Sequence, residues 1–168
     1  YKWNTTEIDP ETMQRIERHR AMRADKGFDT VECYRHVEHI VAKRQDVLLL
    51  ECMSNLLANE MYLEQDSDDG GLAETMSEVE KTGVGMSETL SPVSKKIVQA
   101  LVNLSTRVQD VVIVTNDVFS DGGSLTYDES TREYVKNLAE INCALAREAA
   151  TVTEVVCGIP VIVKKNHP

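Results

Sequence analysis

The stretch DVLLLECMSNLLANEMYL, residues 46–63, joins a short apolar run to a helical pattern. Its first part is a continuous run of aliphatic side chains that ends in Glu51, which is typical of a strand buried on both faces of a parallel sheet. The part from Cys52 onward carries apolar side chains at helical spacing. A buried strand that leads directly into a helix indicates an α/β domain.

Other segments continue this alternation of strands and helices. We expect strand-like segments at 29–33, 110–117, 152–158 and 160–165, and helices at about 9–23, 34–44, 91–108 and from 128 onward. Ser91 and Pro92 form a helix start, and the last two strands form a hairpin-like pair. The pattern predicts one α/β domain over residues 1–168, with a mostly parallel sheet flanked by helices.

The length, net charge and hydropathy of the chain exclude some classes of function. The 168 residues suit a single domain with a real core, and the net charge of −10 argues against nucleic-acid binding. No apolar run reaches the roughly 20 residues that a membrane span needs. The acidic segment 64–89 is expected to be a mobile insertion, because it cannot bury enough surface to order itself.

The four cysteines are scattered, without a C-x-x-C pair or zinc-like spacing. Each lies in or beside an apolar segment. We therefore expect buried free thiols in a protein of the reducing cytoplasm.

Polar side chains close both central strands. Glu51 ends the first, and Thr115, Asn116 and Asp117 end the second. Ligands of parallel α/β sheets bind at the carboxyl ends of the strands, so these residues are the first candidates for a site. An apolar strand closed by an acid is also the Walker-B pattern, in which the carboxylate holds Mg²⁺ against phosphate oxygens. The alternative is a strand that simply ends at a solvated glutamate.

The first predicted helix gathers arginines around a histidine. Arg15, His19 and Arg23 recur every four residues and share a face, and Arg18 and Arg20 flank the histidine. One interpretation is a surface histidine in a charged helix. The other is a neutral imidazole that attacks an α-phosphate while the arginines neutralise the triphosphate. No G-x-x-x-x-G-K-[ST] segment is present, so these residues alone lack a phosphate-cradling loop.

In this order and at this spacing, several short motifs carry a resemblance to a known family. They are TMQRIERHR (12–20), VLLLECMSNLLANEM (47–61), VTNDV (114–118), the set Arg132, Tyr134, Asn142, Leu145 and Ala146, and the ending Gly158, Ile159, Pro160 and Lys164. The chain resembles, over nearly its whole length, the bifunctional adenosylcobinamide kinase/adenosylcobinamide-phosphate guanylyltransferase family of cobalamin biosynthesis.

The resemblance implies a P-loop, RecA-like fold, a homotrimer and two reactions at one nucleotide site. The aminopropanol hydroxyl of adenosylcobinamide is phosphorylated with ATP or GTP, and GMP then passes from GTP, through a guanylylated histidine, to give adenosylcobinamide-GDP. His19 matches that histidine. Glu51 matches the acid that serves Mg²⁺, and Arg15, Arg20 and Asn116 are expected to line the nucleotide site.

The family opens with a strand, a P-loop and a helix, none of which is present in residues 1–168. We therefore expect that about thirty residues of a doubly wound unit precede residue 1. Two alternatives stay open: a guanylyltransferase without the kinase step, and a non-catalytic domain that binds corrinoid or nucleotide without a P-loop.

Overall fold

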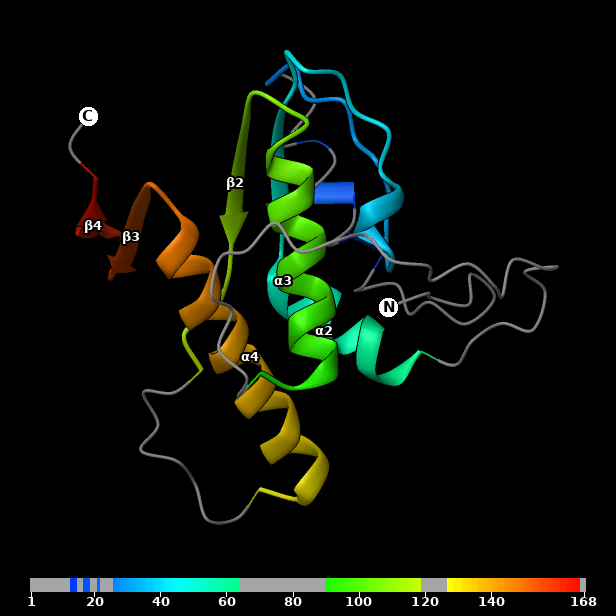
Figure 1. The fold of residues 1–168 in the computed structure, drawn as a ribbon, viewed down its shortest axis with the longest axis vertical. Coiled ribbons are helices and arrows are strands. Elements are labelled where there is room, and N and C mark those ends of the chain that lie inside the picture. The colour runs from blue at the N-terminus through cyan, green and yellow to red at the C-terminus, as the bar shows by residue number, and fades with distance from the viewer. Residues whose placement is uncertain are drawn as a thin grey trace, which may run out of the picture.

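Strands and helices alternate along the described part of the chain (Figure 1). The structure is a computed structural model, and it describes Met13, Gln14, Glu17, Arg18 and Ala21 together with residues 26–63, 90–118 and 127–166. The elements are η1 (Val37–His39), β1 (Val47–Glu51), α2 (Met53–Tyr62), α3 (Pro92–Ser105), β2 (Asp110–Val114), α4 (Glu129–Glu148), β3 (Thr151–Val156) and β4 (Ile159–Lys165). The predicted alternation is therefore confirmed for the central part of the chain.

The two central strands pair in parallel, as predicted. β1 lies beside β2 with Val47 opposite Asp110 and Glu51 opposite Val114. Leu50 and Ile113 point to one face and pack against the buried cluster. On the other face, Leu49 and Val112 are 44% and 51% exposed. The expectation of strands buried on both faces is wrong within the described residues, because their helices cover one face of this sheet.

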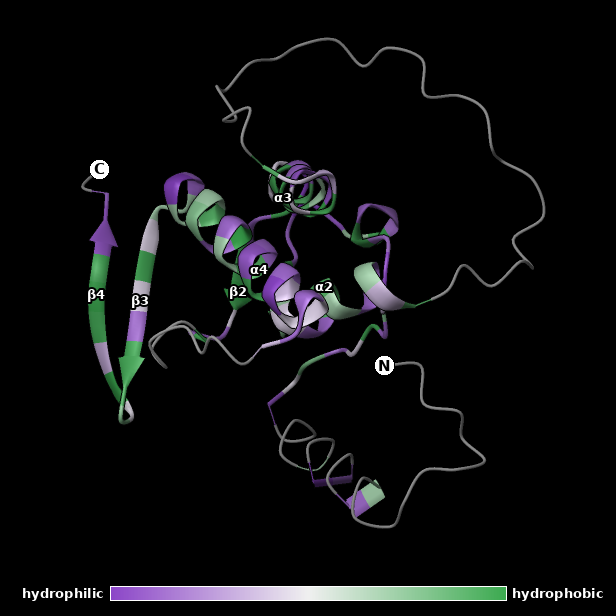
Figure 2. Cartoon of the chain, turned by 90° about the horizontal axis from the view of Figure 1, so that it is seen from below, coloured by the Kyte–Doolittle hydropathy of each residue, from purple (hydrophilic) through white to green (hydrophobic). Residues whose placement is uncertain are grey.

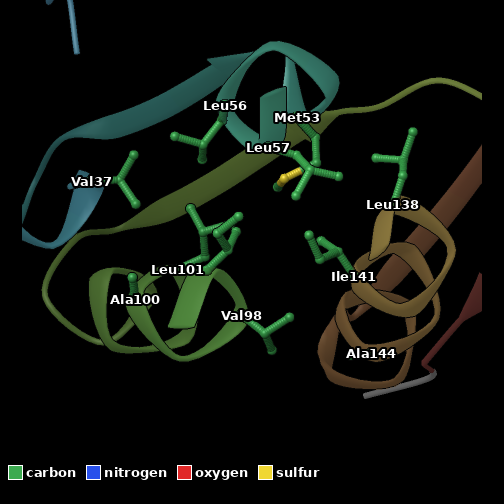
Figure 3. Packing of buried hydrophobic residues seen from close by; sticks show 11 residues of the cluster. Val37, Met53, Leu56, Leu57, Val98, Ala100, Leu101, Leu138, Ile141 and Ala144 are labelled. Carbon is green, nitrogen blue, oxygen red and sulfur yellow. The ribbon is translucent and has the colours of Figure 1, made fainter. Parts of the chain in front are cut away.

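The core lies between three helices and the covered face of the β1–β2 sheet. Met53 and Leu57 of α2, Ile97 of α3 and Leu138 and Ile141 of α4 are at most 2% exposed. Figure 3 shows side chains of α2, α3 and α4 converging on this cluster. Burying a side chain of this size contributes roughly 1.5–3 kcal/mol, so the cluster is the main source of stability that the described residues show.

Capping side chains set where the two long helices begin. The Ser91 hydroxyl accepts a hydrogen bond from the Ser94 N–H at 3.2 Å, and Pro92 is the first residue of α3. The Asp128 carboxylate accepts from the Thr131 N–H at 2.6 Å and opens α4. Both caps satisfy a backbone donor that has no partner within the helix, and both starts agree with the sequence.

The predicted hairpin at the carboxyl end is confirmed, but it forms a second sheet. β3 and β4 are antiparallel and are joined at Cys157 and Gly158, which have φ of 50° and 82°. The Lys164 ammonium donates to the carbonyls of Ala146 and Arg147 at 3.1 and 2.7 Å, which fastens the hairpin to the end of α4. Figure 2 shows the apolar character of the pair, and Val155, Ile159 and Ile162 are at least 62% exposed. The single mostly parallel sheet that the sequence predicted is therefore seen only as the β1–β2 pair.

Two expectations before β1 are wrong. Residues 29–33 form no strand, and the helix expected over 34–44 is reduced to the single turn η1. His36 has left-handed backbone angles, φ 57° and ψ 49°, which a continuous helix does not allow. Its N–H donates to Glu60 at 2.8 Å instead of to a helical carbonyl. Tertiary contacts to α2 therefore override the local helical pattern.

Glu60 of α2 is the anchor for that loop. Its side chain is 4% exposed, and Oε2 accepts from the Lys96 ammonium at 2.7 Å and lies 3.8 Å from Arg35 Nε. Burial acts to raise the pKa of Glu60. The hydrogen bond from the His36 N–H and the Lys96 ammonium outweigh this and hold the pKa below its ordinary value of 4.5. The carboxylate thus joins α2, α3 and the loop before η1.

Five described residues lie within the expected first helix, and all are helical: Met13, Gln14, Glu17, Arg18 and Ala21. Arg15, His19, Arg20 and the acidic segment 64–89 lie outside the described residues. The cysteines are free thiols, as expected. The prediction that they are buried is wrong for Cys143 and Cys157, which are exposed, whereas Cys33 and Cys52 are partly buried. Among the described helices, none has the length and apolarity that crossing a bilayer would require.

We predict that Glu60→Gln lowers the free energy of unfolding by about 1–3 kcal/mol at neutral pH, because Lys96 loses a charged partner. A carboxylate whose pKa is lower in the folded than in the unfolded protein stabilises the fold at pH values above its unfolded-state pKa. This stabilisation is lost as the pH falls through its folded-state pKa. Urea unfolding of the wild type should therefore show a loss of stability below about pH 4.5, and Glu60→Gln should lack this contribution. The exposed Glu133→Gln is the control, and an equal loss in both variants would contradict the assignment.

Candidate functional site

The carboxyl ends of β1 and β2 form one polar edge. Because Glu51 lies opposite Val114 in the parallel register, the residues that follow both strands come together there. Glu51 and Asn116, predicted as site residues from separate strand ends, thus belong to the same edge. Among the described residues, the exposed Glu51 carboxylate has no hydrogen-bonding or charged partner. It is available to a ligand.

A serine in the first turn of α2 links the two strand ends. The Asn116 amide Nδ2 donates to the Ser54 hydroxyl at 3.2 Å. That hydroxyl also lies 2.8 Å from the Cys52 sulfur, one residue after Glu51. Ser54 is only 8% exposed, so its position is set by the packing of α2. The side chain of Asn116 is held against the start of α2.

Two further bonds tie the end of β2 to α4. The Thr115 hydroxyl donates to Asn142 Oδ1 at 2.7 Å, and Asn142 Nδ2 donates to the Asn116 carbonyl at 3.3 Å. Both ends of one amide therefore bind adjacent residues just past the strand. The polar edge is supported from α2 on one side and from α4 on the other.

A tyrosine of α4 supports the same turn of α2. The Tyr134 hydroxyl donates to the Ser54 carbonyl at 3.1 Å. Burial raises the pKa of the Tyr134 phenol above its ordinary value of 10.0, although the Ser54 bond acts in the opposite direction. The phenol therefore stays protonated near neutral pH and remains a hydrogen-bond donor.

Glu51 also lines a cavity of about 210 Å³. The cavity is lined by β1, by most of the segment 28–33 and by Leu101 and Leu104 of α3. The lining is mainly apolar, and Glu51 is one of its acidic residues. Glu51 therefore ends a strand at the polar edge and also lines a mainly apolar cavity.

The donor set at this edge suits Mg²⁺ that arrives with a phosphate ligand. Within the described ranges, no group of three or more His, Cys, Asp or Glu side chains could enclose a metal ion. At the strand ends, Glu51 is an exposed carboxylate that has no partner among the described residues. Mg²⁺ commonly keeps several waters and binds one or two carboxylates together with substrate phosphates, so one such side chain is compatible with its chemistry.

The structure brings together some of the predicted residues and adds others. Glu51 and Asn116 share one edge, whereas Arg15, His19 and Arg20 lie outside the described residues. Ser54, Tyr134 and Asn142 belong to the motifs quoted above, but sequence reasoning gave them no role. The sequence pattern that could have identified Tyr134 and Asn142 is a polar group on or next to the apolar face of α4, which includes Leu138 and Ile141.

The described fold belongs to the class of α/β domains with parallel strands, in which ligands commonly bind at the carboxyl ends of the strands. Comparison with family models narrows this class. The model described as cobinamide kinase / cobinamide phosphate guanyltransferase matches residues 3–163. The chain belongs to this family, whose members act on cobinamide and a nucleotide in cobalamin biosynthesis. A comparison with curated proteins found no match.

We predict that Tyr134→Phe lowers the free energy of unfolding by about 0.5–1.5 kcal/mol, because the Ser54 carbonyl loses its side-chain donor. The measurement is urea unfolding at neutral pH. The matched control is Tyr34→Phe, whose hydroxyl donates to the exposed Glu32 at 3.0 Å, and its effect should be under about 0.5 kcal/mol. Equal effects of the two substitutions would refute a special role for the bond to α2.

Proposed function

We propose that the protein phosphorylates adenosylcobinamide and then transfers GMP from GTP to adenosylcobinamide phosphate. The observation that carries this proposal is the family match over residues 3–163, which includes His19, Glu51 and Asn116. The common polar edge of Glu51 and Asn116 supports it, because a nucleotide and a metal would meet at such an edge. The P-loop, RecA-like form of the fold is part of the same proposal.

His19 is the proposed nucleophile. Its neutral imidazole attacks the α-phosphorus of GTP, a nitrogen–phosphorus bond forms, and pyrophosphate leaves with the bonding electron pair. A phosphate oxygen of adenosylcobinamide phosphate then attacks the same phosphorus and releases the imidazole. Arg15 and Arg20, four residues before and one residue after His19 in the sequence, are proposed to stabilise the negative charge that develops on the phosphate oxygens.

Glu51 is the proposed protein ligand of Mg²⁺. Bound there, the ion would neutralise phosphate charge and favour the departure of pyrophosphate. Asn116 is proposed to contact the nucleotide, since its amide is held at the same edge. In this proposal, His19 is the nucleophile, Arg15 and Arg20 stabilise charge, Glu51 binds the metal ion and Asn116 positions the nucleotide.

We predict that the protein as its gene encodes it gains the mass of one guanylyl group when incubated with GTP and Mg²⁺. The adduct should be acid-labile, as a phosphoramidate is, and absent from His19→Ala. Intact-mass spectrometry makes the measurement, with the exposed His39→Ala as the control that keeps the adduct. A wild-type protein without an adduct would refute guanylyl transfer through histidine.

The kinase step is tested in the same preparation. Phosphorylation of adenosylcobinamide with ATP or GTP is expected, followed by formation of adenosylcobinamide-GDP. An adduct without phosphorylation would identify a guanylyltransferase that lacks the kinase step. Corrinoid or nucleotide binding with neither reaction would identify a non-catalytic binding domain.

We predict that Glu51→Gln slows Mg²⁺-dependent adduct formation about 100-fold or more, because the ion loses its charged protein ligand. Its melting temperature should stay near that of the wild type, since the carboxylate is exposed and has no partner among the described residues. The control is Asp110→Asn, an exposed acid at the opposite end of the sheet. Equal rates for both variants would rule out Glu51 as the metal ligand.

A further inference from the structure

We propose that Asn142 is a positioning residue, which sets the orientation of Asn116 at the polar edge. This inference rests on the proposed function, in which Asn116 contacts the nucleotide. Asn142 itself lies on α4 and acts through Asn116 and Thr115. Its role is therefore to hold a binding group in place.

The first argument is that both polar atoms of the Asn142 side-chain amide form hydrogen bonds. Asn142 Oδ1 accepts from the Thr115 hydroxyl at 2.7 Å, and Nδ2 donates to the Asn116 carbonyl at 3.3 Å. One side chain thus binds two consecutive residues just beyond β2. Neither Thr115 nor Asn116 lies in the strand ladder, so these bonds take the place of sheet pairing where the sheet ends.

The second argument is the rigidity of the support. Leu138 and Ile141, on the same helix, are fully buried in the core. Asn142 directly follows Ile141, so its backbone cannot shift without moving that packing. A rigid helix therefore fixes the plane of the peptide bond after Asn116.

The third argument is the consequence for the Asn116 side chain. Asn116 is exposed, and an exposed amide would ordinarily sample several rotamers. Here its Nδ2 donates to the buried Ser54 at 3.2 Å. Among the described residues, Oδ1 of Asn116 has no partner, so it remains available to a donor group of the nucleotide. Asn142 on one side and Ser54 on the other fix this orientation.

Asn142→Asp tests the proposal with little change of shape. The carboxylate can still accept from Thr115, but it has no donor for the Asn116 carbonyl and repels it. We expect the KM for GTP in adduct formation to rise about 5- to 10-fold, with kcat within about twofold. The matched control is Asn103→Asp on α3, an exposed amide that accepts from Gln99 at 2.9 Å. This control should leave KM unchanged.

A second readout does not depend on activity. In the 168-residue chain, the side-chain amide resonances of Asn116, identified by their loss in Asn116→Asp, should move in Asn142→Asp and stay in Asn103→Asp. Unmoved resonances would overturn the proposal whatever the kinetics show. Moved resonances in a protein whose wild type forms no adduct would support the positioning of Asn116 and refute only the proposed function.

Thr115→Val guards against a variant that fails to fold. Thr115 is exposed, and the substitution removes one of the two bonds of Asn142 without placing a charge near the carbonyl. A smaller shift of the same resonances and a smaller rise in KM are expected. An active wild type with unchanged KM in both Asn142→Asp and Thr115→Val would overturn the inference.

Discussion

The parallel pairing of β1 with β2 is the constraint on which the described structure depends. Parallel strands cannot be joined by a tight turn, so the chain between them must cross over, and α2 and α3 lie within that connection. Both helices contribute to the buried cluster against which Leu50 and Ile113 of the sheet pack. The same pairing brings the two carboxyl ends to one edge, so the core and the site follow from a single register.

Two packed helices hold the polar edge in place through hydrogen bonds from short polar side chains. α2 contributes Ser54 and α4 contributes Tyr134 and Asn142, all close to side chains of the buried core. Binding groups placed on packed helices are held more closely than groups on free loops. Glu51, by contrast, is exposed and has no partner among the described residues. The proposed role of Glu51 as a Mg²⁺ ligand requires an accessible carboxylate, and the exposure of Glu51 meets this requirement.

The loop before β1 shows how a buried charge redirects the chain. Glu60 needs hydrogen-bond donors because an unpaired carboxylate away from water costs several kcal/mol. It obtains them from Lys96 and from the backbone of His36, which adopts left-handed angles to provide one. Local helical periodicity cannot compete with that requirement.

By itself, the sequence determined the α/β class, the central strands, the capped starts of α3 and α4 and the placing of Glu51 and Asn116 at strand ends. These features depend on hydrophobic periodicity and on residues close in the chain. The family resemblance, carried by motifs in order, agrees with the family model. Only the tertiary structure decided that 34–44 is mostly not helical, that the described helices cover one face of β1–β2 and that β3–β4 form a separate sheet. It alone joined Ser54, Asn116 and Asn142, because contacts between residues 26 to 62 positions apart leave no periodic signal in the chain.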